Sequence, residues 1–392
     1  MEPQIAALNK YSASLKLPGL EVTMRKLCYS HAVTACFILI VGALFWGCSD
    51  DNKPTQPSGS WSWSAVGSGL DSAVYSLGLY DNKLIAGGSF LTAGGVSANH
   101  IAAWDGTSWS ALGSGTSGAI LAFAVYGDKL IAAGNFGSAG GASASNIAAW
   151  DGSAWAPLGA GLNSVVFTLT VYDNKLIAGG YFSGSGGVGA NYVASWDGTS
   201  WQPLGAGTNH RVDALAVYGG KLIVGGYFTQ AGEVNVSYIA SWNGSVWEPL
   251  GSGISGTAYP WVMCLKKFNG KLIAGGQFTT AGGIPASDIA SWDGISWSQF
   301  GAGDFGGPIE DLTIFDNKLI AGGIFTWISG VTVNRIAAWD GLSWLPLDSG
   351  LTGGIWHQVN ALEVYNNKLF VGGSFTMADT IAVNNIAEWS RK

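Results

Sequence analysis

One pair of tryptophans, separated by a turn, returns at a nearly constant interval along this 392-residue chain. In the segment IAAWDGTSWSALGSG, which begins at Ile101, the pair is Trp104 and Trp109. The second tryptophan of each pair, or its equivalent, recurs at intervals of 46 to 50 residues: Trp63, Trp109, Trp155, Trp201, Trp247, Trp297 and Trp344. A period of this size points to a chain built from repeated units.

A second marker recurs in step with the first. The motif KLIAGG and its variants begin at Lys83, Lys129, Lys175, Lys221, Lys271, Lys318 and Lys368. Each unit reads as four strands, which in the first unit are expected at residues 74–80, 83–90, 100–104 and 108–112. Asp81-Asn82 and Asp105-Gly106 are turn signals, because these residue types tolerate positive φ. Four strands every 46 to 50 residues predict an all-β, seven-bladed β-propeller with antiparallel blades.

The two ends of the repeat array predict how the ring closes. The last unit has three expected strands, ending at Trp389, and lacks a fourth. The segment Trp63–Gly67 precedes the first complete unit and matches the missing strand. We therefore expect a three-plus-one closure, in which this N-terminal strand completes the seventh blade and removes an exposed sheet edge.

Two further features are interpreted as structural. The recurring tryptophans are expected to pack between strands, because a residue needed in every blade serves the fold. The paired glycines of KLIAGG are expected to let neighbouring blades approach closely. Composition agrees with a compact fold, since 60 glycines, 19 tryptophans and 11% charged residues are too apolar and aromatic for disorder. A net charge of −7 with scattered basic residues argues against nucleic acid as a partner.

The N-terminal region is expected to direct export rather than to fold. Residues 1–23 precede Met24, the expected true start, and residues 24–47 contain a basic stretch followed by an apolar run over 32–47. This run is shorter than the roughly 20 residues of a membrane span, so a signal peptide is favoured over an uncleaved anchor. Gly47-Cys48 resembles the cleavage site of bacterial lipoproteins, and Ser49, Asp50 and Asp51 resemble the surface-export signals of some Bacteroidetes lipoproteins.

This resemblance implies a location and a domain plan. Cys48 would carry lipid, residues 48–60 would form a polar tether, and residues 61–392 would form the propeller. The protein would then lie in the bacterial cell envelope, at the outer membrane, with its side of the membrane left open.

The repeats themselves resemble a family. The motifs KLIAGGxF, IAxWDG and WxxLGxG resemble repeats of bacterial secreted propellers and of fungal cortical polarity-marker proteins, and more distantly those of kelch and galactose-oxidase propellers. The resemblance covers Trp61 to Trp389. It implies the fold but no catalytic residue and no cofactor, because propellers host enzymes, lectins and docking platforms alike.

Candidate binding residues lie where the units differ. Loops that join the fourth strand to the next first strand, and the second strand to the third, share one face of a propeller, and three tryptophans outside the repeat pattern map to it: Trp261, Trp327 and Trp356. Tyr259, Phe305, His357 and Gln358 belong to the same loops of blades 5–7. Exposed aromatic residues would offer a stacking surface for sugar rings or a protein partner. The alternative is that they plug the channel or pack under the loops.

Charged residues at the expected channel mouth give a second set of candidates. Asp304, Glu310 and Asp311 of blade 6 approach the mouth, with Asp213 in the matching strand of blade 4, and they are weak candidates for a hard cation. His210-Arg211 is a candidate for binding an anion. The sequence has no HExxH, GxSxG or phosphate-loop motif. We therefore expect a non-catalytic envelope module that binds a glycan or a protein, and the alternative is a carbohydrate-active hydrolase or lyase that uses these carboxylates.

Overall fold

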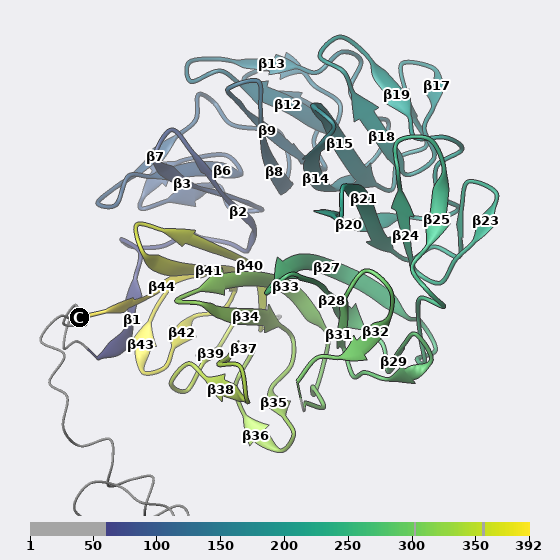
Figure 1. Cartoon of the computed structure of the whole chain (residues 1–392). Coiled ribbons are helices and arrows are strands. Elements are labelled where there is room, and N and C mark those ends of the chain that lie inside the picture. Colours follow the sequence, from purple (N-terminus) through teal and green to yellow (C-terminus); the bar gives the residue numbers. More distant parts are fainter. Residues whose placement is uncertain (1–59, 302, 355–356) are drawn as a thin grey trace, which may run out of the picture. The chain divides into compact units, whose positions relative to one another are not determined.

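The computed structural model describes residues 60–301, 303–354 and 357–392. They form seven four-stranded antiparallel sheets, called blades 1 to 7, one for each unit of the repeat (Figure 1). The expected signal peptide, Cys48 and nearly all of the expected tether lie outside the described residues. Among the residues that are described, no helix is long and apolar enough to span a membrane.

The strands of each blade are named a to d from the channel outward. The a strands are β2 (Val74–Tyr80), β8 (Ile120–Tyr126), β14 (Val166–Tyr172), β20 (Val212–Tyr218), β27 (Trp261–Phe268), β33 (Ile309–Phe315) and β40 (Gln358–Tyr365). The b strands are β3 (Lys83–Gly88), β9 (Lys129–Gly134), β15 (Lys175–Gly180), β21 (Lys221–Gly226), β28 (Lys271–Gln277), β34 (Lys318–Gly323) and β41 (Lys368–Ser374).

The outer strands carry the tryptophan pairs. The c strands are β6 (Ile101–Trp104), β12 (Ile147–Trp150), β18 (Val193–Trp196), β24 (Ile239–Trp242), β31 (Ile289–Trp292), β37 (Ile336–Trp339) and β44 (Ile386–Arg391). The d strands are β7 (Trp109–Ala111), β13 (Trp155–Pro157), β19 (Trp201–Pro203), β25 (Trp247–Pro249), β32 (Trp297–Gln299), β38 (Trp344–Pro346) and β1 (Trp61–Ala65).

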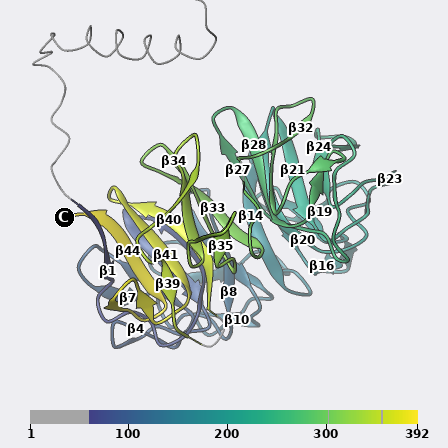
Figure 2. The same ribbon diagram turned by 90° about the horizontal axis from the view of Figure 1, so that it is seen from below.

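The ring closes as the sequence predicts. Strand β1 pairs antiparallel with β44, from Trp61 opposite Arg391 to Ala65 opposite Ala387. The strand lies two residues earlier than the segment 63–67 expected from the sequence, because pairing extends to Trp61. Each a strand contacts the a strands of both neighbouring blades, including β40 against β2, so the inner strands form a closed ring (Figures 1 and 2). Residues of all seven a strands line its central channel.

The recurring tryptophans join neighbouring blades. Trp104 and Trp109 lie opposite each other with ring centroids 5.3 Å apart, and Trp109 Nε1 donates to the carbonyl of Val66 in the preceding blade at 3.1 Å. Trp155, Trp201, Trp247, Trp297 and Trp63 make the equivalent bond. This buried bond satisfies the indole N–H of six of the seven d-strand tryptophans, Trp344 being the exception, and it supports their interpretation as packing residues.

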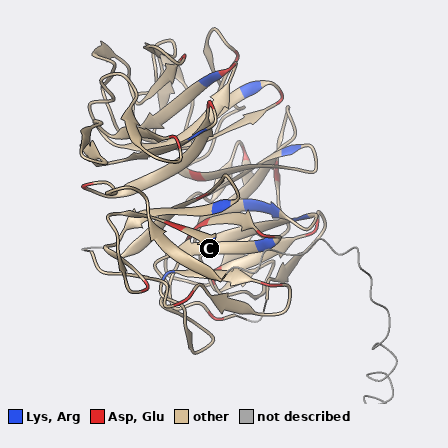
Figure 3. Cartoon of the chain, turned by 90° about the vertical axis from the view of Figure 1, so that its left-hand side faces the viewer, with Lys and Arg blue, Asp and Glu red and all other residues tan. Residues whose placement is uncertain are grey.

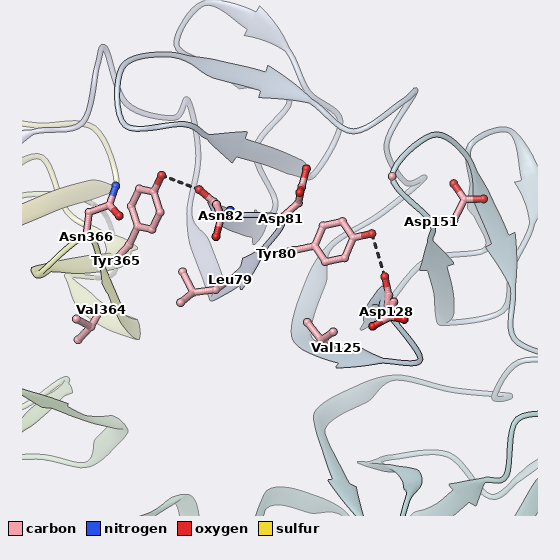
Figure 4. Close-up of a pocket in the computed structure, with 11 residues that line it drawn as sticks. Leu79, Tyr80, Asp81, Asn82, Val125, Asp128, Asp151, Val364, Tyr365 and Asn366 are labelled. Atoms are coloured by element: carbon pink, nitrogen blue, oxygen red, sulfur yellow. Dashed lines mark hydrogen bonds between the residues drawn. The ribbon is translucent and has the colours of Figure 1, made fainter.

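A row of tyrosine hydroxyls joins the blades on the face that carries the a–b and c–d turns, here called the turn face. Tyr80 donates to the carbonyl of Asp128 at 3.2 Å, and Tyr365 donates to that of Asn82 at 2.8 Å (Figure 4). Tyr126, Tyr172 and Tyr218 make the same bond to the next blade. Phenylalanine occupies this position at Phe268 and Phe315, so blades 5 and 6 lack the bond.

The opposite face carries the d–a and b–c loops and is here called the loop face. Each b–c loop contains a short hairpin that the sequence does not reveal, since strands of two residues have no recognisable period. These pairs are β4–β5 (Thr92–Ala93, Val96–Ser97), β10–β11 (Ser138–Ala139, Ala142–Ser143), β16–β17 (Gly184–Ser185, Val188–Gly189), β22–β23 (Gln230–Ala231, Val234–Asn235), β29–β30 (Thr280–Ala281, Ile284–Pro285), β35–β36 (Trp327–Ile328, Val331–Thr332) and β42–β43 (Met377–Ala378, Ile381–Ala382). Strands β26 (Ile254–Ser255) and β39 (Leu351–Thr352) add to two of them.

Candidate functional site

The channel opens on the loop face into a cavity of about 290 Å³. The second residue of the repeated a-strand pattern lines it in every blade: Tyr75, Leu121, Phe167, Asp213, Met263, Glu310 and Asn360. Arg211 and Trp261 complete the lining. The cavity thus combines aromatic walls with two carboxyl groups, one guanidinium group and one amide, a composition typical of small-ligand sites. We call this cavity the mouth.

Trp261 is held in place at the mouth rather than displayed as a free ring. Its Nε1 donates to Asp213 Oδ2 at 2.8 Å, and Arg211 Nε lies 3.2 Å from the same oxygen. The guanidinium group of Arg211 lies over the Trp261 ring, 3.9 Å from its centroid, and 5.3 Å from the centroid of Phe167. These contacts fix the indole from its edge and from one face, so its position in the mouth is set by the protein itself.

Glu310 is the unpaired acid of the mouth. Its carboxyl group has no hydrogen bond or salt bridge to the described residues, in contrast to that of Asp213. Burial raises the pKa of Glu310 to about 7, and the neighbouring carboxyl groups of Asp213 and Asp311 add to the effect. Burial also raises the pKa of Asp213 to about 6, against the opposing charge of Arg211. Near neutral pH, Glu310 can therefore donate or accept a hydrogen bond.

Asp311 and Asp304 do not join Glu310 in a cation site. Asp311 accepts the backbone N–H of Leu362 in blade 7 at 2.7 Å and that of Leu312 at 2.8 Å, so it ties two blades together. Asp304 is exposed and pairs with Ser329 through its backbone. Across the described residues, no group of three or more His, Cys, Asp or Glu side chains is placed to hold a metal ion.

The predicted aromatic residues of blades 5–7 do not all share one surface. Trp261 lines the mouth, whereas Trp327 (40% exposed) and Tyr259 (69% exposed) lie outside its lining. Trp356 lies outside the described residues. His357 lies in the d–a loop, where its carbonyl accepts Arg335 Nε at 2.6 Å.

Gln358 and Phe305 have structural contacts. Gln358 Nε2 donates to Oδ1 of Asn360, a mouth residue, at 2.5 Å. The expectation that Phe305 is exposed is wrong, since it is only 4% exposed. Its ring packs edge-on against Phe325 and Trp344, with centroids 5.0 and 5.2 Å apart, because the d–a loop folds back onto the core of blade 6.

Sequence reasoning missed the aromatic walls of the mouth, Tyr75 and Phe167. The sequence does carry a signal for them. The second position of the repeated a strand varies among the seven blades, whereas the positions around it are similar: Tyr75, Leu121, Phe167, Asp213, Met263, Glu310 and Asn360. Variation at one position of an otherwise regular repeat indicates that packing of the blades does not require a particular side chain there. Lys, Arg, Asp and Glu residues are scattered over the blades (Figure 3).

A larger cavity, with a volume of about 680 Å³, lies on the turn face. Turn residues that recur around the ring line it, among them Tyr80, Asp128 and Tyr365 (Figure 4). Two of these tyrosine hydroxyls are engaged with neighbouring blades. The other polar side chains of this cavity, among them Asp81, Asn82 and Asn366, belong to turns that recur around the ring, so they set this part of the ring apart less than the lining of the mouth does.

Comparison with known proteins supports the fold. Residues 81–102 and 316–337, which run from the a–b turn into the c strand of blades 1 and 6, match a family model described as a domain of unknown function (DUF5122) beta-propeller. The WD40 beta propeller domain of Doa1 is 14% identical with a TM-score of 0.55, covering 85% of this chain and 98% of that chain. The chain is a seven-bladed β-propeller.

A computationally designed protein, Ika8, is 17% identical with a TM-score of 0.47, covering 82% of this chain and 97% of its own. No curated protein matches the sequence significantly. The family-model match and the likeness to the Doa1 domain establish the propeller architecture, which suits a binding or scaffold module.

The raised pKa of Glu310 makes stability depend on pH. Below its ordinary value of 4.5, the carboxyl group is protonated in both the folded and unfolded chain. As the pH rises to about 7, the unfolded chain releases its proton first, so the folded state loses stability across this window. We expect Glu310→Gln to exceed the wild type in free energy of unfolding by about 2 kcal/mol at pH 8, with little difference at pH 4.5.

Urea denaturation at pH 4.5, 6 and 8 measures this effect. Asp304→Asn is the matched control, because it removes the same charge from an exposed loop of the same blade. Equal pH slopes for Glu310→Gln and the wild type would contradict the assignment of the titration to Glu310.

Proposed function

We propose that this propeller is a non-catalytic binding module of the bacterial cell envelope, which holds a glycan at the mouth of its channel. Lipid on Cys48 would anchor it to the outer membrane, and residues 48–60 would serve as the tether. The observation that carries the proposal is the rigid arrangement of Trp261, Arg211 and Asp213 beside the uncommitted carboxyl group of Glu310.

A sugar matches the chemistry of the mouth. Its hydroxyl groups require donors and acceptors, which Glu310, Asn360 and Arg211 supply, and its C–H faces require apolar walls, which Tyr75 and Phe167 supply. The volume of about 290 Å³ suits one or two sugar units. A protein partner needs roughly 800 Å² of surface on each side, so this small concave site fits a glycan better.

The alternative is a carbohydrate-active hydrolase or lyase that uses the carboxyl groups of the mouth. The raised pKa of Glu310 favours it, because a carboxylic acid that stays protonated near pH 7 can act as a general acid. The second carboxyl group of such a pair must be free to act as base or nucleophile. Asp213 is instead engaged by both Arg211 and Trp261, which favours binding over catalysis.

The test is a glycan screen followed by isothermal titration calorimetry. We expect Trp261→Ala to weaken glycan binding at least tenfold, about 1.4 kcal/mol, because Asp213 and Arg211 lose the indole that positions them. Trp327→Ala is the matched control, since it removes an indole from the same face but outside the mouth. Circular dichroism and thermal melting establish that both variants fold.

Three outcomes would contradict the proposal. Absence of binding to every glycan would redirect the search to protein partners. Equal affinity of Trp261→Ala and Trp327→Ala would remove the mouth as the site. Cleavage of a bound glycan by the wild type, abolished in Glu310→Gln, would favour the enzyme.

The lipid anchor is tested by a separate variant, Cys48→Ala, which is expected to shift the protein from the membrane fraction to the soluble fraction.

A further inference from the structure

A second aromatic cluster occupies the loop face of blades 3 and 4. His210 lies at its centre, stacked on Tyr192 with centroids 6.0 Å apart and an interplanar angle of 9°. Tyr181 and Tyr227 meet the same imidazole edge-on at 5.7 and 5.1 Å. Tyr238 extends the cluster through Tyr227 at 5.9 Å. We call these five residues the tyrosine platform.

The other blades show that the fold does not require these tyrosines. The residue after the paired glycines is tyrosine at 181 and 227, whereas the other five blades carry Ser89, Asn135, Gln277, Ile324 and Ser374. The residue before the c strand is tyrosine at 192 and 238, whereas the others carry His100, Asn146, Asp288, Arg335 and Asn385. Tyrosine at both positions is thus special to two adjacent blades.

Tyr192 and Tyr238 also occupy a conformation that suits other residues better. Their φ angles are 68° and 64°, in the left-handed region, where an aromatic residue is disfavoured by about 1 kcal/mol. At the equivalent position of blade 2, Asn146 has the same conformation and uses its side chain to accept the N–H of Phe136 and to bond the carbonyl of Leu162. The two tyrosines pack partly against the blade core but give up these hydrogen bonds.

The polar atoms of the platform are uncommitted. Among the described residues, the hydroxyls of Tyr181, Tyr192, Tyr227 and Tyr238 have no hydrogen-bond partner, unlike the tyrosine hydroxyls of the turn face. Nδ1 of His210 is buried without a partner. Burial lowers the pKa of His210, and Arg211 adds to this, so the imidazole is neutral at pH 7. The platform therefore presents uncharged aromatic rings with free donors and acceptors.

The platform adjoins the mouth. Arg211 follows His210 directly in the chain, and its guanidinium group lies over Phe167 and Trp261 in the mouth. A ligand that leaves the mouth toward blades 3 and 4 would reach His210 next and then the tyrosines beside it. The charge of Arg211 is paired with Asp213, so no unpaired cation interrupts this path.

We propose that the tyrosine platform binds the continuation of a neutral polysaccharide chain whose end occupies the mouth. The inference rests on the proposed function for its ligand class, and it adds that the ligand is a chain rather than a single sugar. Flat rings with unpaired hydroxyls match the C–H faces and hydroxyl groups of pyranose rings. Their lack of charge matches a neutral polymer.

The test replaces the tyrosines with residues that other blades carry. The variant Tyr192→Asn/Tyr238→Asn restores a side chain suited to the left-handed conformation, so its melting temperature is expected to equal or exceed that of the wild type. Calorimetry with neutral hexasaccharides of glucose, xylose, mannose and galactose, and with the matching disaccharides, measures binding. We expect at least a tenfold loss of hexasaccharide affinity and an unchanged disaccharide affinity.

The variants separate this inference from the proposed function. Trp261→Ala is expected to weaken both lengths of sugar, whereas Tyr181→Ser/Tyr227→Gln, a second platform variant, weakens only the hexasaccharide. If Trp261→Ala weakens binding and neither platform variant does, the mouth is supported as the glycan site and the platform is overturned as its extension. If only the platform variants weaken binding, the mouth is overturned. Two further results would overturn the platform as a glycan site. In one, the protein binds a decaproline peptide but none of the sugars; in the other, it binds neither.

Discussion

Trp63→Ala is expected to lower the free energy of unfolding by about 4 kcal/mol, because it removes a large core side chain from the strand that closes the ring. Trp63 is 1% exposed, packs on Trp389 at a centroid distance of 5.0 Å, and donates from Nε1 to the carbonyl of Leu347 at 3.1 Å. The substitution leaves a cavity and an unpaired carbonyl at the junction of blades 6 and 7.

Urea denaturation measures this loss, and Trp61→Ala is the control. Trp61 lies in the same strand and is only partly buried, so about 1–2 kcal/mol is expected for its removal. Deletion of residues 60–67 would expose the edge of β44, and the truncated protein is expected to self-associate unless a peptide of those residues is added. A monomeric, fully stable deletion variant would show that closure by β1 is dispensable.

Gly180→Ala is expected to destabilise the fold by about 3 kcal/mol, far more than the same change at the neighbouring Gly179. A Cβ atom at Gly180 would lie 2.2 Å from the carbonyl oxygen of Val165, a backbone atom of the same blade. Backbone cannot yield as a side chain does. This second glycine of the pair is glycine in all seven blades: Gly88, Gly134, Gly180, Gly226, Gly276, Gly323 and Gly373.

Gly179→Ala provides the matched control, with an expected loss of about 1 kcal/mol. Its Cβ would meet the side chain of Val212 in the next blade at 2.4 Å. Blade 2 carries Ala133 at this position and packs it against the neighbouring blade without exposure. Thermal melting of the two variants compares them directly, and equal losses would contradict the distinction between backbone and side-chain obstruction.

Much of the architecture was predictable because a repeat supplies its own comparison. Seven copies of the tryptophan pair gave the blade number, and the unpaired ends of the array predicted the closure that β1 and β44 form. The interpretation of the paired glycines is confirmed for the first glycine, which faces the next blade. The second serves a contact within its own blade, which spacing alone does not reveal.

The candidate site was harder to predict because exposure is a property of the folded loop. Phe305 looked like a surface aromatic residue, yet the short loop turns it into the core. Trp261 was identified, but its partner Arg211 lies a whole blade away in the sequence. The tyrosine platform was not predicted, because its tyrosines stand at regular positions of the repeat. Only comparison with the other blades shows that tyrosine is unusual at these positions.

The tyrosine hydroxyl bonds of the turn face affect which boundary between blades opens most easily. Phe268 leaves the boundary between blades 5 and 6 without such a bond, and Trp344 Nε1 has no partner among the described residues where other blades bond across. Rings of Phe268, Phe300 and Trp344 fill this boundary instead. Cys264 Sγ donates a long hydrogen bond to the carbonyl of Ile309 across this boundary, at 3.8 Å. Because the boundary lacks the tyrosine and tryptophan bonds of other blades, amide exchange is expected to report the easiest opening here rather than where the terminal strands meet. Trp261 and Glu310 stand on opposite sides of that boundary, so local opening there would change the distance between two residues that line the mouth.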